Sequence, residues 1–162
     1  MYSVIAILDR PARARLSWIQ SFAASFGVVP RPIYGHITLA SFEDDGLIPA
    51  CADALAGQTA FSVDFPGVDI LEGEPVVAAL AAREGTLEAV QETLCAALNI
   101  REKEVPHVAL IREERLNLSW VRTAMGQMFQ PYSARVEAIE IVRDTNGGFE
   151  VLKRVELKGD SV

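Results

Sequence analysis

The stretch Gly35-His36-Ile37-Thr38-Leu39-Ala40-Ser41-Phe42 alternates in character from one residue to the next, as a strand in a sheet does. An extended backbone puts alternate residues on the same face, giving one face of His36, Thr38, Ala40 and Phe42 and another of Ile37, Leu39 and Ser41. The predicted strand therefore presents an imidazole and a hydroxyl side by side, from His36 and Thr38.

The second histidine of the chain lies in a similar stretch. The segment Pro106-His107-Val108-Ala109-Leu110-Ile111 repeats the alternation, and the chain contains two histidines in all. They are 107 − 36 = 71 residues apart. This spacing organises the rest of the sequence.

A shift of 71 residues aligns the segments that follow the two histidines without a gap. The aligned pairs are Leu39 with Leu110, Leu47 with Leu118, Phe61 with Tyr132, Ser62 with Ser133, Val68 with Ile139 and Ile70 with Ile141. We therefore predict a single two-lobed domain, with a first repeat over about residues 1–72 and a second over about 73–162. Equivalent strands of the two lobes are expected to face one another across a central cleft.

The expected elements follow the order β-α-β-α-β and then β-α-β-α-β-β. Alternating and apolar runs predict strands at residues 2–8, 35–42, 59–71 with a break at Pro66-Gly67, 76–82, 106–112, 133–143 and 149–157. Apolar residues at helical spacing predict helices after Asp9, Asp45, Thr86 and Asn117, and Asn146-Gly147 predicts a hairpin turn. The fold class expected is α+β.

Composition and charge narrow the range of functions. Half of the 162 residues are apolar, and the net charge is −7, which argues against tight binding of long nucleic acid. A small nucleotide or an RNA end in a locally basic cleft remains compatible with this charge. No apolar run is long enough to cross a bilayer, and residues 1–9 are predicted to form a buried strand rather than a signal peptide.

The cysteines and histidines predict neither a disulfide nor a metal site. Cys51 and Cys95 lie in apolar helical patterns, which favours buried thiols in a reducing cytoplasm. The histidines have no cysteine or acidic residue beside them at metal-ligand spacing. We expect no cofactor.

Two histidines at equivalent positions suit displacement at phosphorus. Histidine titrates near neutral pH, so a neutral imidazole can take a proton from the attacking hydroxyl while an imidazolium gives one to the leaving oxygen. A hydroxyl beside the imidazole can donate to a non-bridging phosphate oxygen. The competing interpretation is a plain structural domain, in which the matched histidines are a coincidence.

The motif His36-Ile37-Thr38, paired with a second histidine motif in the other half, resembles the two His-x-Thr/Ser motifs of the two-histidine (2H) phosphoesterase superfamily, which includes 2′-5′ RNA ligase-like and cyclic phosphodiesterase proteins. The resemblance implies a duplicated α+β fold with two antiparallel sheets facing a cleft and helices outside. It implies a metal-independent phosphodiesterase or ligase acting on RNA ends, 2′,3′-cyclic phosphates or related nucleotide phosphoesters. His36 and His107 would be the acid and base, in an order left open, and Thr38 a phosphate-binding hydroxyl.

The second motif departs from this pattern, because Ala109 stands where Thr38 stands in the first. Alanine has no hydroxyl to donate. The protein is then a slower enzyme, an enzyme with another donor, or a protein that binds nucleotides or RNA ends without turnover. Strand alternation puts Arg112 on the face opposite His107, which makes it a poor substitute.

Two residues before the first motif are further candidates for substrate contact. Arg31 and Tyr34 precede His36 and are placed to line the mouth of the cleft, where they would meet a phosphate or stack a base. The alternative is an ordinary surface pair. Trp18 and Trp120 are expected at the edges of the lobes, and Met125 and Met128 in the core.

Overall fold

The computed structural model describes residues 1–25, 35–101, 103–114 and 117–159. The elements run β1 (Tyr2–Leu8), α1 (Arg10–Ala24), β2 (His36–Phe42), a short 3₁₀ helix (Asp45–Leu47), α2 (Ile48–Ala54), β3 (Phe61–Phe65), β4 (Gly67–Ile70), β5 (Val76–Leu80), α3 (Thr86–Leu98), β6 (His107–Arg112), α4 (Leu118–Met128), β7 (Tyr132–Thr145) and β8 (Gly148–Glu156). The order of elements predicted from the sequence is confirmed.

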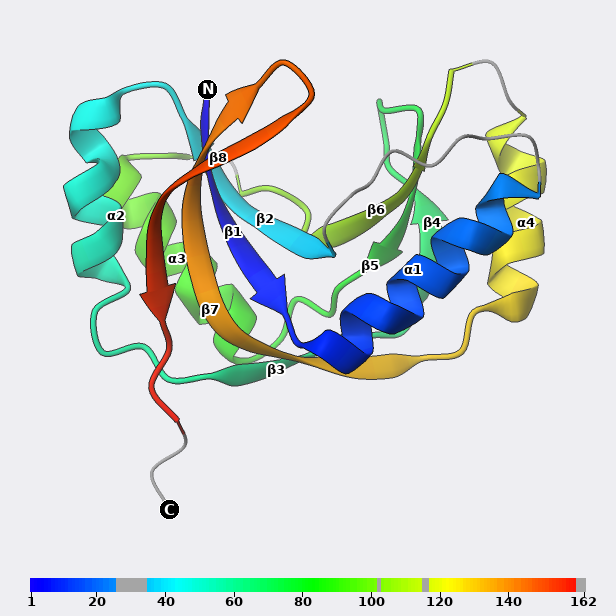
Figure 1. The fold of residues 1–162 in the computed structure, drawn as a ribbon, viewed down its shortest axis with the longest axis horizontal. Coiled ribbons are helices and arrows are strands. Elements are labelled where there is room, and N and C mark those ends of the chain that lie inside the picture. Colours follow the sequence, from blue (N-terminus) through cyan, green and yellow to red (C-terminus); the bar gives the residue numbers. More distant parts are fainter. Residues whose placement is uncertain (26–34, 102, 115–116, 160–162) are drawn as a thin grey trace.

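The strands of the described residues form two antiparallel sheets. The first has the order β2-β1-β7-β3, with β8 also paired to β7, and the second has the order β4-β5-β6. Figure 1 shows the two sheets diverging from a common base, with helices on their outer sides. The predicted α+β architecture is confirmed.

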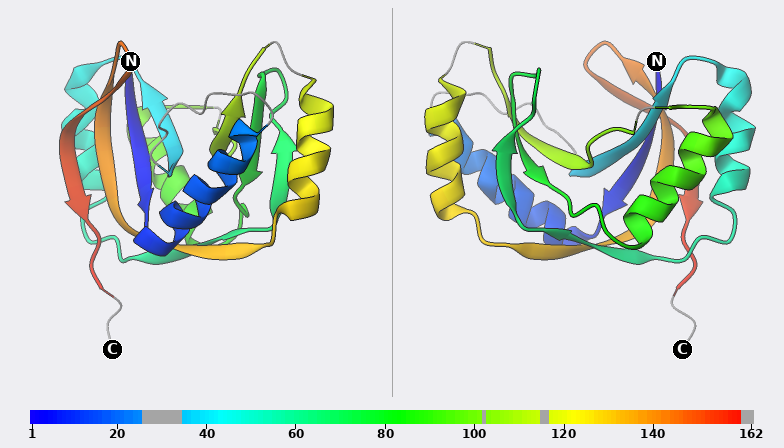
Figure 2. Two further views of the ribbon diagram at one scale, coloured as in Figure 1. Left: turned by 45° about the vertical axis from the view of Figure 1, so that its right-hand side comes forward. Right: turned by 180° about the vertical axis from the view of Figure 1, so that it is seen from behind.

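The helices are exchanged between the two halves of the sequence. α1, from the first half, packs against β6 of the second half, and α3, from the second half, packs against β2 of the first. α2 packs on α3, and α4 covers β4 and β5. Neither half therefore folds around its own helices alone (Figure 2). The two halves share one large core.

The strand register carries the same repeat as the sequence. β3 and β7 pair so that Val63 lies opposite Ala134, and 134 − 63 = 71. In an antiparallel pair, a residue can lie opposite its own equivalent in the repeat only where the twofold axis that relates the two halves passes between the two strands. β8 pairs with the C-terminal part of β7, and the described residues of the first half contain no counterpart to it.

The predictions for the cap of α4, for the β7–β8 turn and for the burial of the two cysteines are confirmed. The Asn117 side chain accepts a hydrogen bond from the Trp120 backbone N–H at 3.2 Å, which caps α4. Gly147 closes the β7–β8 hairpin at φ 111°, a conformation that favours glycine. Cys51 and Cys95 are buried free thiols, and burial raises the pKa of Cys51 to about 11. No helix among the described residues is long and apolar enough to cross a membrane.

Candidate active site

His36 is the first residue of β2, at a place where the chain passes close under α1. A Cβ atom on the preceding residue, Gly35, would lie 2.9 Å from Leu16 Cδ1 and 3.3 Å from Arg13 Cγ. Leu16 is itself only 1% exposed, so it has no room to move away. A residue without a side chain at position 35 lets α1 approach the beginning of the histidine strand.

His107 is the first residue of β6 and has a defined orientation. Its Nδ1 lies 2.7 Å from the backbone carbonyl oxygen of Val105. Because a carbonyl only accepts hydrogen bonds, Nδ1 carries the proton in this contact, and in the neutral ring Nε2 carries the lone pair. Nε2 is then the nitrogen of His107 that can accept a proton.

The two histidine strands meet at their N-terminal ends. β2 and β6 contact each other although they belong to different sheets, and Figures 1 and 2 show the beginning of β2 beside the beginning of β6. Since His36 and His107 are the first residues of these strands, the backbones of both histidines lie at this junction.

The burial pattern places both histidines on the less buried side of their strands. His36 and Thr38 are half-buried, while Ile37 and Leu39 between and after them are fully buried. In β6 the same pattern recurs: His107 and Ala109 are half-buried, and Val108 and Leu110 are buried. The predicted faces of these eight residues are confirmed.

A β-bulge interrupts the alternation at the same place in both strands. Between β1 and β2 the partners step from Val4–Ala40 to Ile5–Thr38 and leave out Leu39. Between β5 and β6 they step from Val77–Ile111 to Ala78–Ala109 and leave out Leu110. An extra residue in one strand reverses the alternation beyond it.

The bulges correct four of the predicted orientations, those of Ala40, Ser41, Phe42 and Arg112. Ser41, not Ala40, shares the face of His36, since Ser41 lies opposite Ser3 with the two hydroxyl oxygens 3.4 Å apart. Phe42 lies on the other face for the same reason. Arg112 lies opposite Val76, on the face that carries His107 and Ala109, so its predicted position on the opposite face was wrong. Its guanidinium pairs with Glu74 at 3.1 Å, and both side chains are about half exposed.

The neighbours of Thr38 and Ala109 differ in character. On the first sheet the Ser41 hydroxyl donates to Glu104 Oε1 at 2.8 Å. On the second sheet Ala109 packs against a small apolar cluster of Leu71, Val76, Ala78 and Leu80. The face of Thr38 therefore carries a polar contact at Ser41, whereas Ala109 itself has apolar neighbours.

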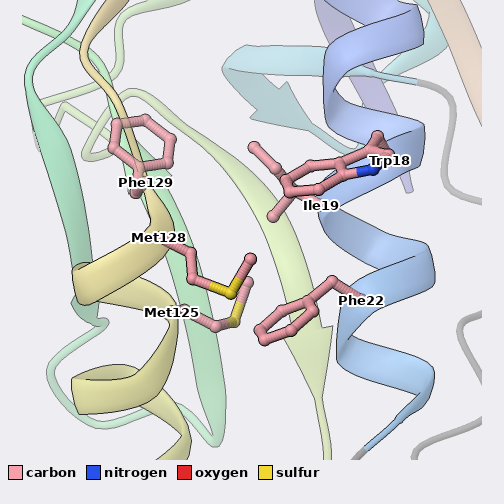
Figure 3. A pocket seen from close by; sticks show the side chains of 6 residues that line it. All are labelled: Trp18, Ile19, Phe22, Met125, Met128 and Phe129. Carbon is pink, nitrogen blue, oxygen red and sulfur yellow. The ribbon is translucent and has the colours of Figure 1, made fainter.

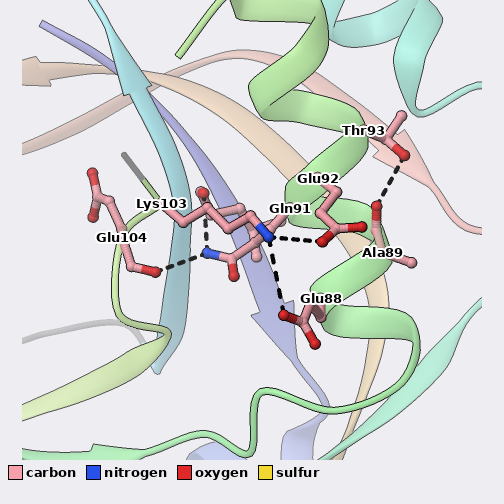
Figure 4. A network of polar contacts seen from close by, with 8 residues as sticks. Glu88, Ala89, Gln91, Glu92, Thr93, Lys103 and Glu104 are labelled. Atoms are coloured by element: carbon pink, nitrogen blue, oxygen red, sulfur yellow. Dashed lines mark hydrogen bonds and ion pairs between the residues drawn. The ribbon is translucent and has the colours of Figure 1, made fainter. Parts of the chain in front are cut away.

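A buried glutamine connects the first histidine strand to the segment that leads into the second (Figure 4). Gln91 of α3 is 3% exposed, and its Nε2 donates to the backbone carbonyls of Leu39 at 3.3 Å and Glu104 at 3.2 Å. Leu39 is the bulge residue of β2. Gln91 therefore fixes the bulge and the approach to His107 relative to each other, a connection that the sequence analysis missed. The equivalent residue of the repeat, 71 positions earlier, is the buried Gln20.

A small apolar recess lies elsewhere, between α1 and α4 (Figure 3). Its lining consists of Trp18, Ile19, Phe22, Met125, Met128 and Phe129. Met125 is buried as predicted, but Met128 is 40% exposed, which corrects its predicted place in the core. None of the predicted site residues that the structure describes, His36, Thr38, His107 and Ala109, lines this recess.

Two of the sequence candidates cannot be placed. Arg31 and Tyr34 lie outside the described residues.

Among the described residues, no three His, Cys, Asp or Glu side chains gather at a spacing that would hold a metal ion.

Comparison with solved structures identifies the fold. E. coli LigT in its apo form superposes with a TM-score of 0.68 at 17% identity, covering 97% of this chain and 96% of LigT. LigT complexed with NADP⁺ gives 0.62 at 20% identity over 96% of both chains, and a structure described as a phosphoesterase gives 0.63 at 19% identity over 97% of both. Neither the protein-family models nor the curated proteins yield a match. The chain has the same fold as E. coli LigT, a fold that the histidine motifs implied.

Proposed function

We propose that this protein is a metal-independent phosphoesterase that acts on 2′,3′-cyclic phosphates or related phosphoesters of nucleotides and RNA ends. The observation that carries the proposal is the position of its two histidines. They begin two equivalent strands that meet at their N-terminal ends, on the less buried faces, in a fold shared with LigT and a phosphoesterase. We further propose the cytoplasm as its location.

In this proposal His36 and His107 transfer the protons at one phosphate. One neutral imidazole removes a proton from the attacking water or ribose hydroxyl, while the other, as imidazolium, protonates the leaving oxygen. The Val105 carbonyl, which accepts from His107 Nδ1 at 2.7 Å, leaves Nε2 of that ring for the proton transfer. In the reverse direction, ligation, the two rings exchange roles.

Thr38 and Arg112 would hold the phosphate. The Thr38 hydroxyl lies on the His36 face and can donate to a non-bridging oxygen. The Arg112 guanidinium lies on the His107 face, where the bulge at Leu110 directs it, and can pair with a phosphate in place of Glu74. Arg112 would thus add a cation to the face of His107 without replacing the hydroxyl that Ala109 lacks.

The chemistry of the ligands bound by similar proteins supports a small nucleotide as substrate. LigT has been crystallised with NADP⁺, 3′-AMP, ATP and phosphate. The net charge of −7 disfavours a long nucleic acid. We therefore propose a small nucleotide or the end of an RNA as the partner.

A second candidate function is binding of nucleotides or RNA ends without turnover. Ala109, in its apolar cluster, favours it, because the second motif offers no hydroxyl to the transition state. Losing one such donor costs roughly 10²–10³ in rate.

The experiment that separates these functions is a hydrolysis assay. The purified protein is incubated with nucleoside 2′,3′-cyclic phosphates in the presence of excess EDTA. We expect turnover that survives chelation and that falls roughly 10²–10⁴-fold in His36→Ala and in His107→Ala. Turnover that is lost on chelation, or unchanged in either variant, would refute the proposed mechanism. Nucleotide binding without turnover would support the second candidate.

A further inference from the structure

Phe149 contacts His36 from the opposite edge of the first sheet. Phe149 is the second residue of β8, directly after the β7–β8 turn. Its ring centroid is 5.3 Å from that of His36, with the two rings nearly perpendicular at 84°. β2 and β8 are separated in the sheet by β1 and β7, a span of about 14 Å that no side chain bridges, so the β7–β8 hairpin itself leans over this surface and brings Phe149 to the histidine.

The pairing register shows that this surface is the face of the candidate site. Val151 lies opposite Val142, Val142 opposite Ser3, and Ser3 opposite Ser41. Side chains of paired residues lie on the same face, so Val151 shares the face of Ser41 and His36. Phe149 is two residues before Val151 in a regular part of the ladder and therefore lies on this face too.

Phe149 also breaks the twofold symmetry of the candidate site. The ladders that hold His36 and His107 are equivalent, including their bulges. β8 has no counterpart among the described residues of the first half, so the hairpin adds an aromatic side chain beside His36 alone. Phe149 is 41% exposed as a residue, so it is not covered by the rest of the protein and is accessible to a ligand.

We propose that Phe149 stacks the nucleobase of the substrate and so determines that the nucleoside lies on the His36 side of the phosphate. This inference rests on the proposed function and adds a base-binding residue to it. Stacking on an aromatic ring is available to every base, because every base has a π-face. The residue would thus give a preference for nucleoside phosphoesters over phosphoesters of a bare sugar, with little discrimination among bases.

The test compares two substrates that differ in the base alone, a nucleoside 2′,3′-cyclic phosphate and ribose 2′,3′-cyclic phosphate. In Phe149→Leu, we expect kcat/KM for the nucleoside substrate to fall roughly five- to a hundredfold, mainly through KM, with little change for the ribose substrate. Phe149→Tyr should retain the preference. Val151→Ala, which removes another exposed apolar side chain from the same strand and face, is the matched control and should behave like the wild type.

Any other result contradicts the proposal that Phe149 stacks the nucleobase. An equal loss for both substrates would show that Phe149 acts on His36 rather than on the base, and no loss would show that it does neither. If the wild type turns over neither substrate, the proposed function fails. Calorimetry then tests stacking by itself: Phe149→Leu should weaken binding of 3′-AMP but not of inorganic phosphate, and equal binding by both proteins would refute it.

Discussion

At the scale of single residues, Leu39 and Leu110 determine which side chains accompany each histidine. Each is the extra residue of a bulge, and each is fully or almost fully buried. Beyond the bulge, Ser41 joins the His36 face and Arg112 joins the His107 face. The face of His107 therefore carries a cation where the face of His36 carries a hydroxyl.

The first prediction concerns Ala109, whose side chain shares the His107 face. We expect Ala109→Thr to raise kcat on cyclic phosphates roughly ten- to a hundredfold, because a hydrogen bond to a charged oxygen contributes about 1.5–3 kcal/mol. Ala109→Val is the matched control, with the same shape but no hydroxyl. Equal rates in the threonine and valine variants would show that the hydroxyl itself contributes nothing.

The second prediction concerns Arg112 and its partner Glu74, 3.1 Å away. Phosphate must compete with this carboxylate for the guanidinium. We expect Glu74→Gln to tighten inorganic phosphate binding and Arg112→Met to weaken it, each by several-fold, with the effects shrinking at high salt. Calorimetric titration with phosphate measures both. An unchanged affinity of Arg112→Met for inorganic phosphate would show that Arg112 does not bind the phosphate.

Sequence reasoning placed the residues before each bulge correctly and those after it wrongly. Strand alternation located His36, Thr38, His107 and Ala109 on the less buried faces. It failed at Ser41 and Arg112, because a bulge depends on how two strands pair and cannot be recognised from the sequence of either strand alone. The contact between Phe149 and His36 could not be predicted from the sequence either, since Phe149 belongs to an edge strand near the other end of the chain.

At the scale of elements, the approach of α1 to β2 depends on Gly35. A Cβ there would lie 2.9 Å from Leu16 Cδ1. We expect Gly35→Ala to lower the free energy of unfolding by about 1–3 kcal/mol, the usual cost of overpacking a core. Urea denaturation measures this change.

Gly126 provides the matched control for that substitution. It lies within α4, and a Cβ there would meet Val68 Cγ2 alone, at 3.9 Å. Gly126→Ala should raise the free energy of unfolding by about 0.5–1 kcal/mol, because alanine favours a helix interior. If Gly35→Ala also raises the free energy of unfolding, position 35 has room for a methyl group and the predicted crowding is absent.

A further prediction at this scale concerns the stability of the protein without the Gln91 amide. Gln91→Met keeps the length of the side chain but removes the donor for the Leu39 and Glu104 carbonyls. We expect a loss of about 1–3 kcal/mol in the free energy of unfolding, since buried acceptors lose their partner. The exposed Gln127 of α4 is the comparison, and Gln127→Met should change stability by less than about 0.5 kcal/mol. Equal effects at both positions would contradict the bridging role of Gln91.

At the scale of the whole molecule, a twofold relation passes between β3 and β7, where Val63 faces Ala134. The sequence predicted this relation through its 71-residue shift. The exchange of helices was not predictable, because helical periodicity says which face of α1 or α3 is buried but not which sheet covers it. The exchange makes the position of one histidine strand depend on the other half of the chain.

The proposed mechanism requires His36 and His107 to act together on one phosphate. A crystal structure of the protein grown with inorganic phosphate tests it most directly. We expect a single phosphate within hydrogen-bonding distance, about 3 Å, of both imidazole rings and of the Thr38 hydroxyl. A phosphate bound away from the histidines, or imidazole rings too far apart to reach the same anion, would contradict it.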